Sequence, residues 1–184
     1  MQSKRGPINI ASQNPTNVVL TGFMGTGKTT VGRLLAERLG YRFVDTDAVI
    51  ESRHGPISDI FATHGEEHFR QLERVIAKEL AVQSDLVVAT GGRLMLDAVN
   101  AAALGSNGRV FCLTASADEV LRRVGGDSEG SERPLLAAAD RLRRIAGLLA
   151  ERAAGYLRFE QVDTEGRAPE EIVSDLVARL ETEA

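Results

Sequence analysis

The sequence predicts an α/β fold in which helices cover both faces of a parallel sheet. Four short apolar runs, each typical of a buried strand, lie at 17–20, 41–44, 85–89 and 109–113. Helical patterns separate these runs, as expected when parallel strands are joined by crossover helices. Residues 22–29 match the phosphate-binding pattern Gly-x4-Gly-Lys-Ser/Thr, and they lie between the first strand and a helix.

The first strand and the first helix give the phosphate-binding motif its structural context. The predicted helix runs from Lys28 to Leu39 and ends at Gly40, a typical C-terminal stop. Glycines allow backbone N–H groups to surround phosphate oxygens, a lysine adds positive charge, and a Thr hydroxyl can bind Mg²⁺. We therefore predict a nucleoside triphosphate site formed by an exposed Lys28 with Gly25, Thr26, Gly27, Thr29 and Thr30. The alternative is a Gly-rich turn with a chance lysine.

Two carboxylates follow the second predicted strand, which covers 41–44. Asp45 and Asp47 stand where the carboxyl end of a parallel strand meets a ligand crevice. If the chain is extended here, the two side chains point the same way, so one could serve Mg²⁺ and the other could receive a proton from a substrate hydroxyl. The alternative is that an Asp caps the helix predicted to begin near Ala48.

Two charged residues lie beside the apolar stripe of the next predicted helix. The stripe repeats at Phe69, Leu72, Ile76 and Leu80, and Arg70 and Glu73 are neighbours at i, i+3. By themselves they would form a surface ion pair of little energetic value. After the strand at 85–89, Gly91 and Gly92 would allow backbone N–H groups to approach a ligand, or would simply form a turn.

The second half of the chain has one polar interruption. The segment 125–132 is rich in Gly, Ser and Glu, and Arg122, Arg123 and Arg133 flank it. A flexible segment beside arginines suits closure over phosphates, so we expect a lid at about 124–136, although an ordinary surface loop is the alternative. Helices are predicted from about Leu136 to Ala153, and from Pro169 through Ile172, Leu176 and Leu180.

Composition limits the domain count and the partners. The 184 residues suit one domain at 17–184, preceded by a polar and flexible arm at 1–16. A net charge of −4 argues against general binding of nucleic acid or membrane. Cys112, the only cysteine, lies in an apolar run and is expected in the core. Because the sequence shows neither a secretory signal nor an apolar run of membrane-spanning length, we expect a cytoplasmic protein, and we expect it to be a monomer.

Taken in order, these motifs resemble the shikimate kinase family from about Val18 to Leu180, most closely between Thr21 and Glu73. The resemblance implies five parallel strands in the order 2-3-1-4-5, a lid, and ATP-dependent phosphorylation of the 3-hydroxyl of shikimate, in the pathway to chorismate and aromatic amino acids.

The same resemblance implies a role for each matched residue. Lys28 and Thr29 would hold the triphosphate and Mg²⁺, Asp45 would position the metal, and Asp47 would bind the acceptor hydroxyl and act as base. Arg70 and Arg152 would bind the substrate carboxylate, and Glu73 would orient Arg70. Gly91 and Gly92 would approach the substrate, Arg133 would close onto the phosphates, and Arg123 would lie against adenine.

The chain departs from the family pattern at two places. Arg93 stands where the family has a third glycine, and the segment after Tyr156 lacks the usual Ala-Asp pair. We expect the Arg93 side chain to point away from the acceptor, into solvent or onto an acidic residue. Arg93 also motivates one rival, a kinase of another small hydroxylated acid. A second rival is a regulatory module that binds a nucleotide or metabolite without turnover.

Overall fold

Five parallel strands form a single sheet in the order β2-β3-β1-β4-β5. The computed structural model describes residues 17–124 and 134–182, except for the side chains of 134–138. The strands are β1 (Asn17–Gly22), β2 (Arg42–Asp45), β3 (Leu86–Ala89), β4 (Gly108–Thr114) and β5 (Glu160–Asp163). This confirms the predicted α/β fold and strand order. The predicted arm, Arg133 and most of the predicted lid lie outside the described residues.

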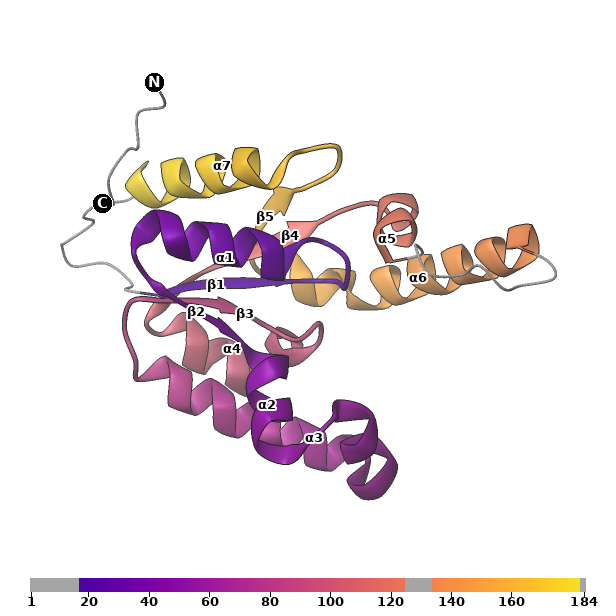
Figure 1. The fold of residues 1–184 in the computed structure, drawn as a ribbon, viewed down its shortest axis with the longest axis horizontal. Helices are drawn as coiled ribbons and strands as arrows, with labels where there is room; N and C mark the ends of the chain where they lie inside the picture. The colour runs from indigo at the N-terminus through magenta and orange to yellow at the C-terminus, as the bar shows by residue number, and fades with distance from the viewer. Residues whose placement is uncertain (1–16, 125–133, 183–184) are drawn as a thin grey trace.

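Helices cover both faces of this sheet (Figure 1). On one face, α1 (Lys28–Leu39) and α7 (Pro169–Thr182) lie side by side and enclose an apolar cluster that includes Leu35, Phe111 and Leu176. On the other face lie α2 (Thr46–His54), α3 (Ile57–Ala81) and α4 (Ala98–Gly105), packed around residues that include Ile50 and Ile76. Each face therefore has its own hydrophobic core.

A third and smaller cluster joins the remaining helices to the phosphate-binding loop. Phe23 packs with Val120 of α5 (Ala117–Val124) and Ile145 of α6 (Pro134–Tyr156). A short 3-10 helix, η1 (Leu94–Leu96), follows β3 and contacts α6. No helix in the described part of the chain is long and apolar enough to cross a membrane.

The two central strands explain why the sequence pattern was so clear. Every residue of β1 and of β3 is buried, because both strands lie inside the sheet with helices on both faces. Parallel pairing aligns β1 with β3 and β2 with β3, so their carboxyl ends meet at one edge. The phosphate-binding loop, Asp45 and Gly91 all follow these ends, and the sheet brings them together.

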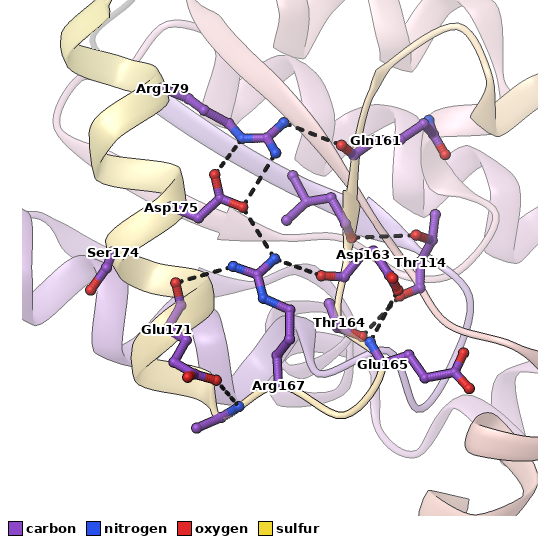
Figure 2. A network of polar contacts seen from close by, with 12 residues as sticks. Thr114, Gln161, Asp163, Thr164, Glu165, Arg167, Glu171, Ser174, Asp175 and Arg179 are labelled. Carbon is purple, nitrogen blue, oxygen red and sulfur yellow. Dashed lines mark hydrogen bonds and ion pairs between the residues drawn. The ribbon is translucent and has the colours of Figure 1, made fainter.

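The edge strand β5 was not predicted from the apolar pattern, because its sequence is Glu-Gln-Val-Asp and only Val162 is buried. Polar contacts hold this strand to α7 (Figure 2). Arg179 donates to the Asp175 carboxylate and to the Gln161 carbonyl, and Arg167 donates to the Asp163 carbonyl and to Asp175. Hydrogen bonds and ion pairs thus hold β5 in the fold, whereas apolar packing holds the central strands.

The helices for which the sequence predicted a range, α1, α6 and α7, agree closely with that range. The bounds of α1 match the prediction, and Gly40 takes the left-handed conformation (φ 72°) expected at a helix end. The α6 helix extends a few residues beyond both ends of the predicted 136–153. The α3 helix bends at Gly65, whose φ of 78° is not helical. This bend places the first turns of α3 beside the pocket described below.

Candidate active site

The phosphate-binding loop has the backbone that its glycines permit. Gly25 and Gly27 have φ of 74° and 94°, in the left-handed region that other residues avoid. Gly27 is the N-cap of α1, so the helix begins at Lys28 with its free N–H groups next to the loop. The Thr26 hydroxyl donates to the Phe23 carbonyl at 2.8 Å and closes the loop from inside. This arrangement suits a bound phosphate chain.

Lys28 is not the exposed loop lysine that the sequence suggested. Its side chain is half-buried, and its ammonium group donates to the carbonyls of Gly22 (3.0 Å) and Phe23 (2.8 Å). Burial lowers the pKa of Lys28 to about 8, although the nearby carboxylates of Asp47 and Asp45 oppose the shift. The lysine therefore lies folded back on its own loop, within the pocket that the two carboxylates share.

Asp45 combines the two functions that the sequence left as alternatives. Its Oδ1 accepts from the backbone N–H groups of Asp47 (3.1 Å) and Ala48 (3.4 Å), so Asp45 is the N-cap of α2. Its Oδ2 accepts from the Thr29 hydroxyl at 3.0 Å. Capping uses one oxygen and leaves the other beside Thr29, where two hard oxygen donors meet, as a Mg²⁺ site requires.

Asp47 differs from the extended geometry assumed from sequence, because α2 begins at Thr46 and Asp47 lies in its first turn. Its Oδ1 is buried without a hydrogen-bond partner among the described residues. Burial raises the pKa of the Asp47 carboxyl, and Asp45 adds to the rise, while Lys28 opposes it. An unpartnered buried oxygen is costly, so this atom is available for a ligand hydroxyl.

Arg70 and Glu73 form the predicted pair, but the pair is not confined to the surface. Arg70 Nη1 donates to Glu73 Oε2 at 2.7 Å, and Glu73 is only 2% exposed. Burial raises the pKa of Glu73, whereas the hydrogen bond and charge of Arg70 oppose that rise. Glu66 Oε1 accepts from Nη2 of Arg70 at 2.8 Å and from Nε at 3.2 Å. Two carboxylates therefore orient the guanidinium group.

Arg152 reaches the same pocket from α6. Its Nε is buried without a hydrogen-bond partner among the described residues, and its guanidinium lies 5.2 Å from the centre of the Phe23 ring. Its Nη1 is 3.7 Å from the position that a Cβ on Gly92 would take. The structure thus provides a second arginine that can bind an anionic group.

These groups line one pocket of about 420 Å³, which we call the Asp47 pocket. Of the sequence-predicted residues it contains Gly25, Lys28, Thr29, Asp45, Asp47, Arg70, Glu73, Gly91, Gly92 and Arg152. A small polar molecule placed here would meet three carboxylates, three arginines and the phosphate-binding loop. Such a pocket can bring a hydroxylated acid next to a nucleotide.

The remaining predicted nucleotide residues line a second pocket of about 460 Å³, the Arg123 pocket. It contains Thr26, Gly27, Thr30 and Arg123, together with Arg167 of the β5 to α7 connection and Pro169 at the start of α7. The Arg123 guanidinium is held by the carbonyls of Gly25 (3.2 Å) and Thr164 (2.7 Å). The phosphate-binding loop therefore contributes to both pockets.

Several lining residues were missed from the sequence. Phe61 and Phe69 pack with ring centroids 4.9 Å apart and ring planes tilted by 42°, and they give the Asp47 pocket an apolar wall. In the sequence Phe69 is only one member of an apolar stripe, so nothing separated it from ordinary core residues. Arg167 could have been found from its position after an edge strand, but that strand has no apolar signature.

Arg93 contacts an acidic side chain, as predicted. Its Nη1 is 3.4 Å from Glu66 Oε1, and the two side chains are 45% and 53% exposed. Arg93 nevertheless lines the Asp47 pocket, so it is not fully turned away from it. Because Glu66 also contacts Arg70, one carboxylate links this unusual arginine to the predicted substrate arginine.

Comparison with known proteins identifies one family. A family model described as shikimate kinase matches residues 24–181. A shikimate kinase of Geobacter metallireducens is 43% identical over 173 residues, which cover 93% of this chain and 95% of that protein. A shikimate kinase of Geobacter sulfurreducens is 45% identical over 162 residues, covering 87% and 88% of the two chains.

Solved structures agree with this result. A shikimate kinase from Acinetobacter baumannii, in complex with shikimate, superimposes with a TM-score of 0.80 at 34% identity and covers 91% of this chain and 94% of its own. A shikimate kinase from Aquifex aeolicus gives a TM-score of 0.74 at 30% identity, covering 91% and 97%. A gluconokinase from Sinorhizobium meliloti, at 18% identity and a TM-score of 0.54, shares the fold alone.

Proposed function

The chain belongs to the shikimate kinase family, and we propose that it transfers the γ-phosphoryl group of ATP to the 3-hydroxyl of shikimate in the pathway to chorismate and aromatic amino acids. The observation that carries the site assignment is the Asp47 pocket, which joins the phosphate-binding loop to a buried carboxylate and two arginines. The products are ADP and shikimate 3-phosphate.

On the nucleotide side, Lys28 moves from the carbonyls of Gly22 and Phe23 to the β- and γ-phosphates. The structure supports this step because the ammonium group already lies in the pocket and is held only by neutral acceptors of its own loop. Loop N–H groups and the start of α1 hold the phosphate oxygens. The adenine base of ATP extends into the Arg123 pocket, where it lies against Arg123.

Thr29 and Asp45 would hold Mg²⁺, because their oxygens lie 3.0 Å apart beside the loop and oxygen donors are the ligands that this ion prefers. When bound, the ion would neutralise charge on the triphosphate oxygens. The Asp45 Oδ1 stays on the N-terminus of α2 and keeps the side chain in position. The protein thus fixes the metal ligand through the backbone of a helix.

On the acceptor side, Arg70 and Arg152 bind the shikimate carboxylate, and Asp47 orients the 3-hydroxyl. Planar guanidinium groups suit a carboxylate, and Glu73 and Glu66 restrict the rotation of Arg70. The unpartnered Asp47 Oδ1 accepts the hydroxyl hydrogen. Gly91 and Gly92 let the acceptor approach the backbone.

In the transfer step, the acceptor oxygen forms a bond to the γ-phosphorus while the bond from that phosphorus to the β–γ bridging oxygen breaks. The hydroxyl proton passes to Asp47, and the bridging electrons leave with ADP. Lys28 and the loop N–H groups stabilise the charge on the transferring group. Arg133 would add to this stabilisation by closing with the lid, although it lies outside the described residues.

We propose that the protein acts as a monomer in the cytoplasm, without a nucleic-acid or membrane partner; its net charge of −4 supports the absence of a general nucleic-acid partner. Sedimentation of the purified protein at assay concentration tests the oligomeric state.

The experiment that tests the function is coupled measurement of ADP release with and without shikimate. We expect release that depends on shikimate, together with a product phosphorylated at the 3-hydroxyl by NMR. Arg93 favours one alternative, because it places an additional cation at the pocket, where another small hydroxylated acid could bind. Testing a panel of small hydroxylated acids in the same assay shows whether shikimate or another acid is the preferred acceptor. If none of these acids stimulates ADP release, the result would favour a module that binds ligands without turnover.

A further inference from the structure

The last turn of α6 is fastened to the segment that follows β3. The Tyr156 hydroxyl donates a hydrogen bond to the Gly92 carbonyl, and the Tyr156 side chain is only 6% exposed. Burial raises the pKa of the Tyr156 phenol above its ordinary value, so the hydroxyl keeps its proton at neutral pH. A neutral hydroxyl of this kind is a dependable donor to a backbone carbonyl.

Two further contacts strengthen the same junction. The Cα of Gly155 lies so close to η1 that a Cβ there would come within 2.6 Å of Leu96 Cδ2. Arg158 Nη2 donates to the Met95 carbonyl at 2.9 Å. We call this junction the α6–η1 seam; it comprises Gly155, Tyr156 and Arg158 on one side and Gly92, Met95 and Leu96 on the other. It lies where the sequence departs from the family pattern, next to Arg93 and after Tyr156.

Arg152 is the residue that the seam would position. It precedes Tyr156 by four residues, so both side chains project from the same face of α6. Unlike Arg70, which two carboxylates orient, Arg152 makes no ion pair with the described residues. Its guanidinium rests on the Phe23 ring and lies beside Gly92. Its place in the pocket therefore depends on the Phe23 ring, on the neighbouring Tyr156 side chain, whose rise in pKa Arg152 opposes, and on where α6 is held.

The rest of α6 offers few alternatives for holding it. Of the side chains described on this helix, only Ile145 and Tyr156 are buried, and Ile145 packs with Phe23 of the phosphate-binding loop and with Val120 of α5. Figure 1 shows the helix extending away from the sheet toward α5. Leu148 and Leu149 pack against the Phe23 cluster on the N-terminal side of Arg152, and the seam is the attachment on its C-terminal side.

We propose that Tyr156 is a positioning residue, whose hydroxyl fixes Arg152 relative to the Gly91–Gly92 backbone so that one acceptor carboxylate meets both at a set spacing. This rests on the proposed function, in which Arg152 binds the shikimate carboxylate. Loss of the hydroxyl frees the last turn of α6, and binding must then order it. The free-energy cost of this ordering lowers the affinity for the acceptor and leaves the affinity for ATP unchanged.

Tyr156→Phe tests the proposal, and Tyr41→Phe is a matched control. Tyr41 is the only other tyrosine, is half-buried, and packs against the cluster on the α1 and α7 face. For Tyr156→Phe we expect the shikimate KM and the calorimetric shikimate Kd to rise about three- to tenfold, the range of one hydrogen bond, while the ATP KM changes less than about twofold. Tyr41→Phe should leave both constants unchanged.

A double-mutant cycle separates positioning from a general structural effect. In an Arg152→Lys background, where the guanidinium is absent, Tyr156→Phe should change the shikimate KM by less than about twofold. Equal fold effects with and without Arg152, or equal effects on the shikimate and ATP constants, would overturn the proposal. Shikimate-dependent ADP release by the wild type tests the proposed function separately. An active wild type with a Tyr156→Phe variant that behaves like Tyr41→Phe overturns the positioning role alone.

Arg158→Met provides a second test should Tyr156→Phe not fold. Arg158 is the exposed member of the seam, so its loss weakens the same attachment without opening the core. We expect a rise in shikimate KM of about two- to threefold with the ATP KM unchanged, in keeping with a partly exposed hydrogen bond. An unchanged shikimate KM in this folded variant would overturn the proposal.

Discussion

The Asp47 carboxylate lies directly against Gly91, where a Cβ would come within 2.4 Å of Asp47 Oδ1. Any side chain at position 91 would displace the proposed base. The Gly91 N–H group donates to the Thr46 hydroxyl at 2.9 Å, which fixes the two segments relative to each other. The carboxyl end of β3 and the first turn of α2, which carries Asp47, therefore form one surface.

Asp47→Asn should lower turnover by about 100-fold or more, because an amide cannot take the acceptor proton, while ATP affinity stays within about threefold. Steady-state kinetics and calorimetric titration with ATP measure the two effects. Loss of ATP affinity with turnover retained would assign Asp47 to the nucleotide and would contradict the division of roles between Asp45 and Asp47.

Lys28→Met should lower turnover by about 100- to 1000-fold through loss of charge at the transferring phosphoryl group. Because Lys28 also bonds to two loop carbonyls, we expect a loss of about 1 kcal/mol in the free energy of unfolding. Turnover and chemical denaturation on one preparation measure both, with Lys78→Met, an exposed lysine of α3, as control. A folded Lys28→Met variant with normal turnover would refute the triphosphate assignment.

The pKa of Lys28, lowered to about 8 by burial, predicts an alkaline limit for ATP binding. Below this pKa the lysine is charged and attracts the triphosphate, and above it the charge is lost. The value of kcat/KM for ATP should therefore fall above about pH 8, whereas kcat should not, since bound triphosphate raises the pKa of the lysine again. Lys28→Arg should remove this alkaline fall in kcat/KM. If the fall persists in the variant, it is caused by the titration of another group.

Arg70→Lys should raise the shikimate KM about tenfold or more and leave the ATP KM nearly unchanged, because lysine keeps the charge but loses the planar pair of donors that fits a carboxylate. Arg74→Lys is the control. Arg74 lies on the same helix but pairs with Asp97 at 2.8 Å, outside the Asp47 pocket. Equal effects on both substrates would show that Arg70 has only a structural role.

Arg93→Gly should change the shikimate KM only a few-fold, or about 1 kcal/mol, because the pair with Glu66 is half-exposed and weak. The order of preference among acceptors should not change. A panel of small hydroxylated acids measures this. A wild type that ignores shikimate, together with an Arg93→Gly variant that phosphorylates it, would instead show that Arg93 selects a different acid.

Much of the fold was readable from the sequence, for a physical reason. Strands β1 and β3 are buried on both faces, so they contain the unbroken apolar runs 18–20 and 86–89, and α1 lies between a phosphate-binding motif and a glycine. The edge strand β5 is held by Arg167 and Arg179, and its residues carry no periodic apolar signal. Its existence followed only from resemblance to a family.

The candidate site shows the same division. The sequence by itself predicted the phosphate-binding loop and placed Asp45 and Asp47 after a strand, whereas Arg70 and Arg152 entered the predicted site only through the resemblance to a family. Their physical states depended on contacts distant in sequence. Only the tertiary structure decided that Lys28 is half-buried, that Asp45 caps α2 and contacts Thr29 at once, and that Glu66 joins Arg70 to Arg93. Burial and hydrogen-bond partners set pKa and orientation, and both arise when separate segments pack together.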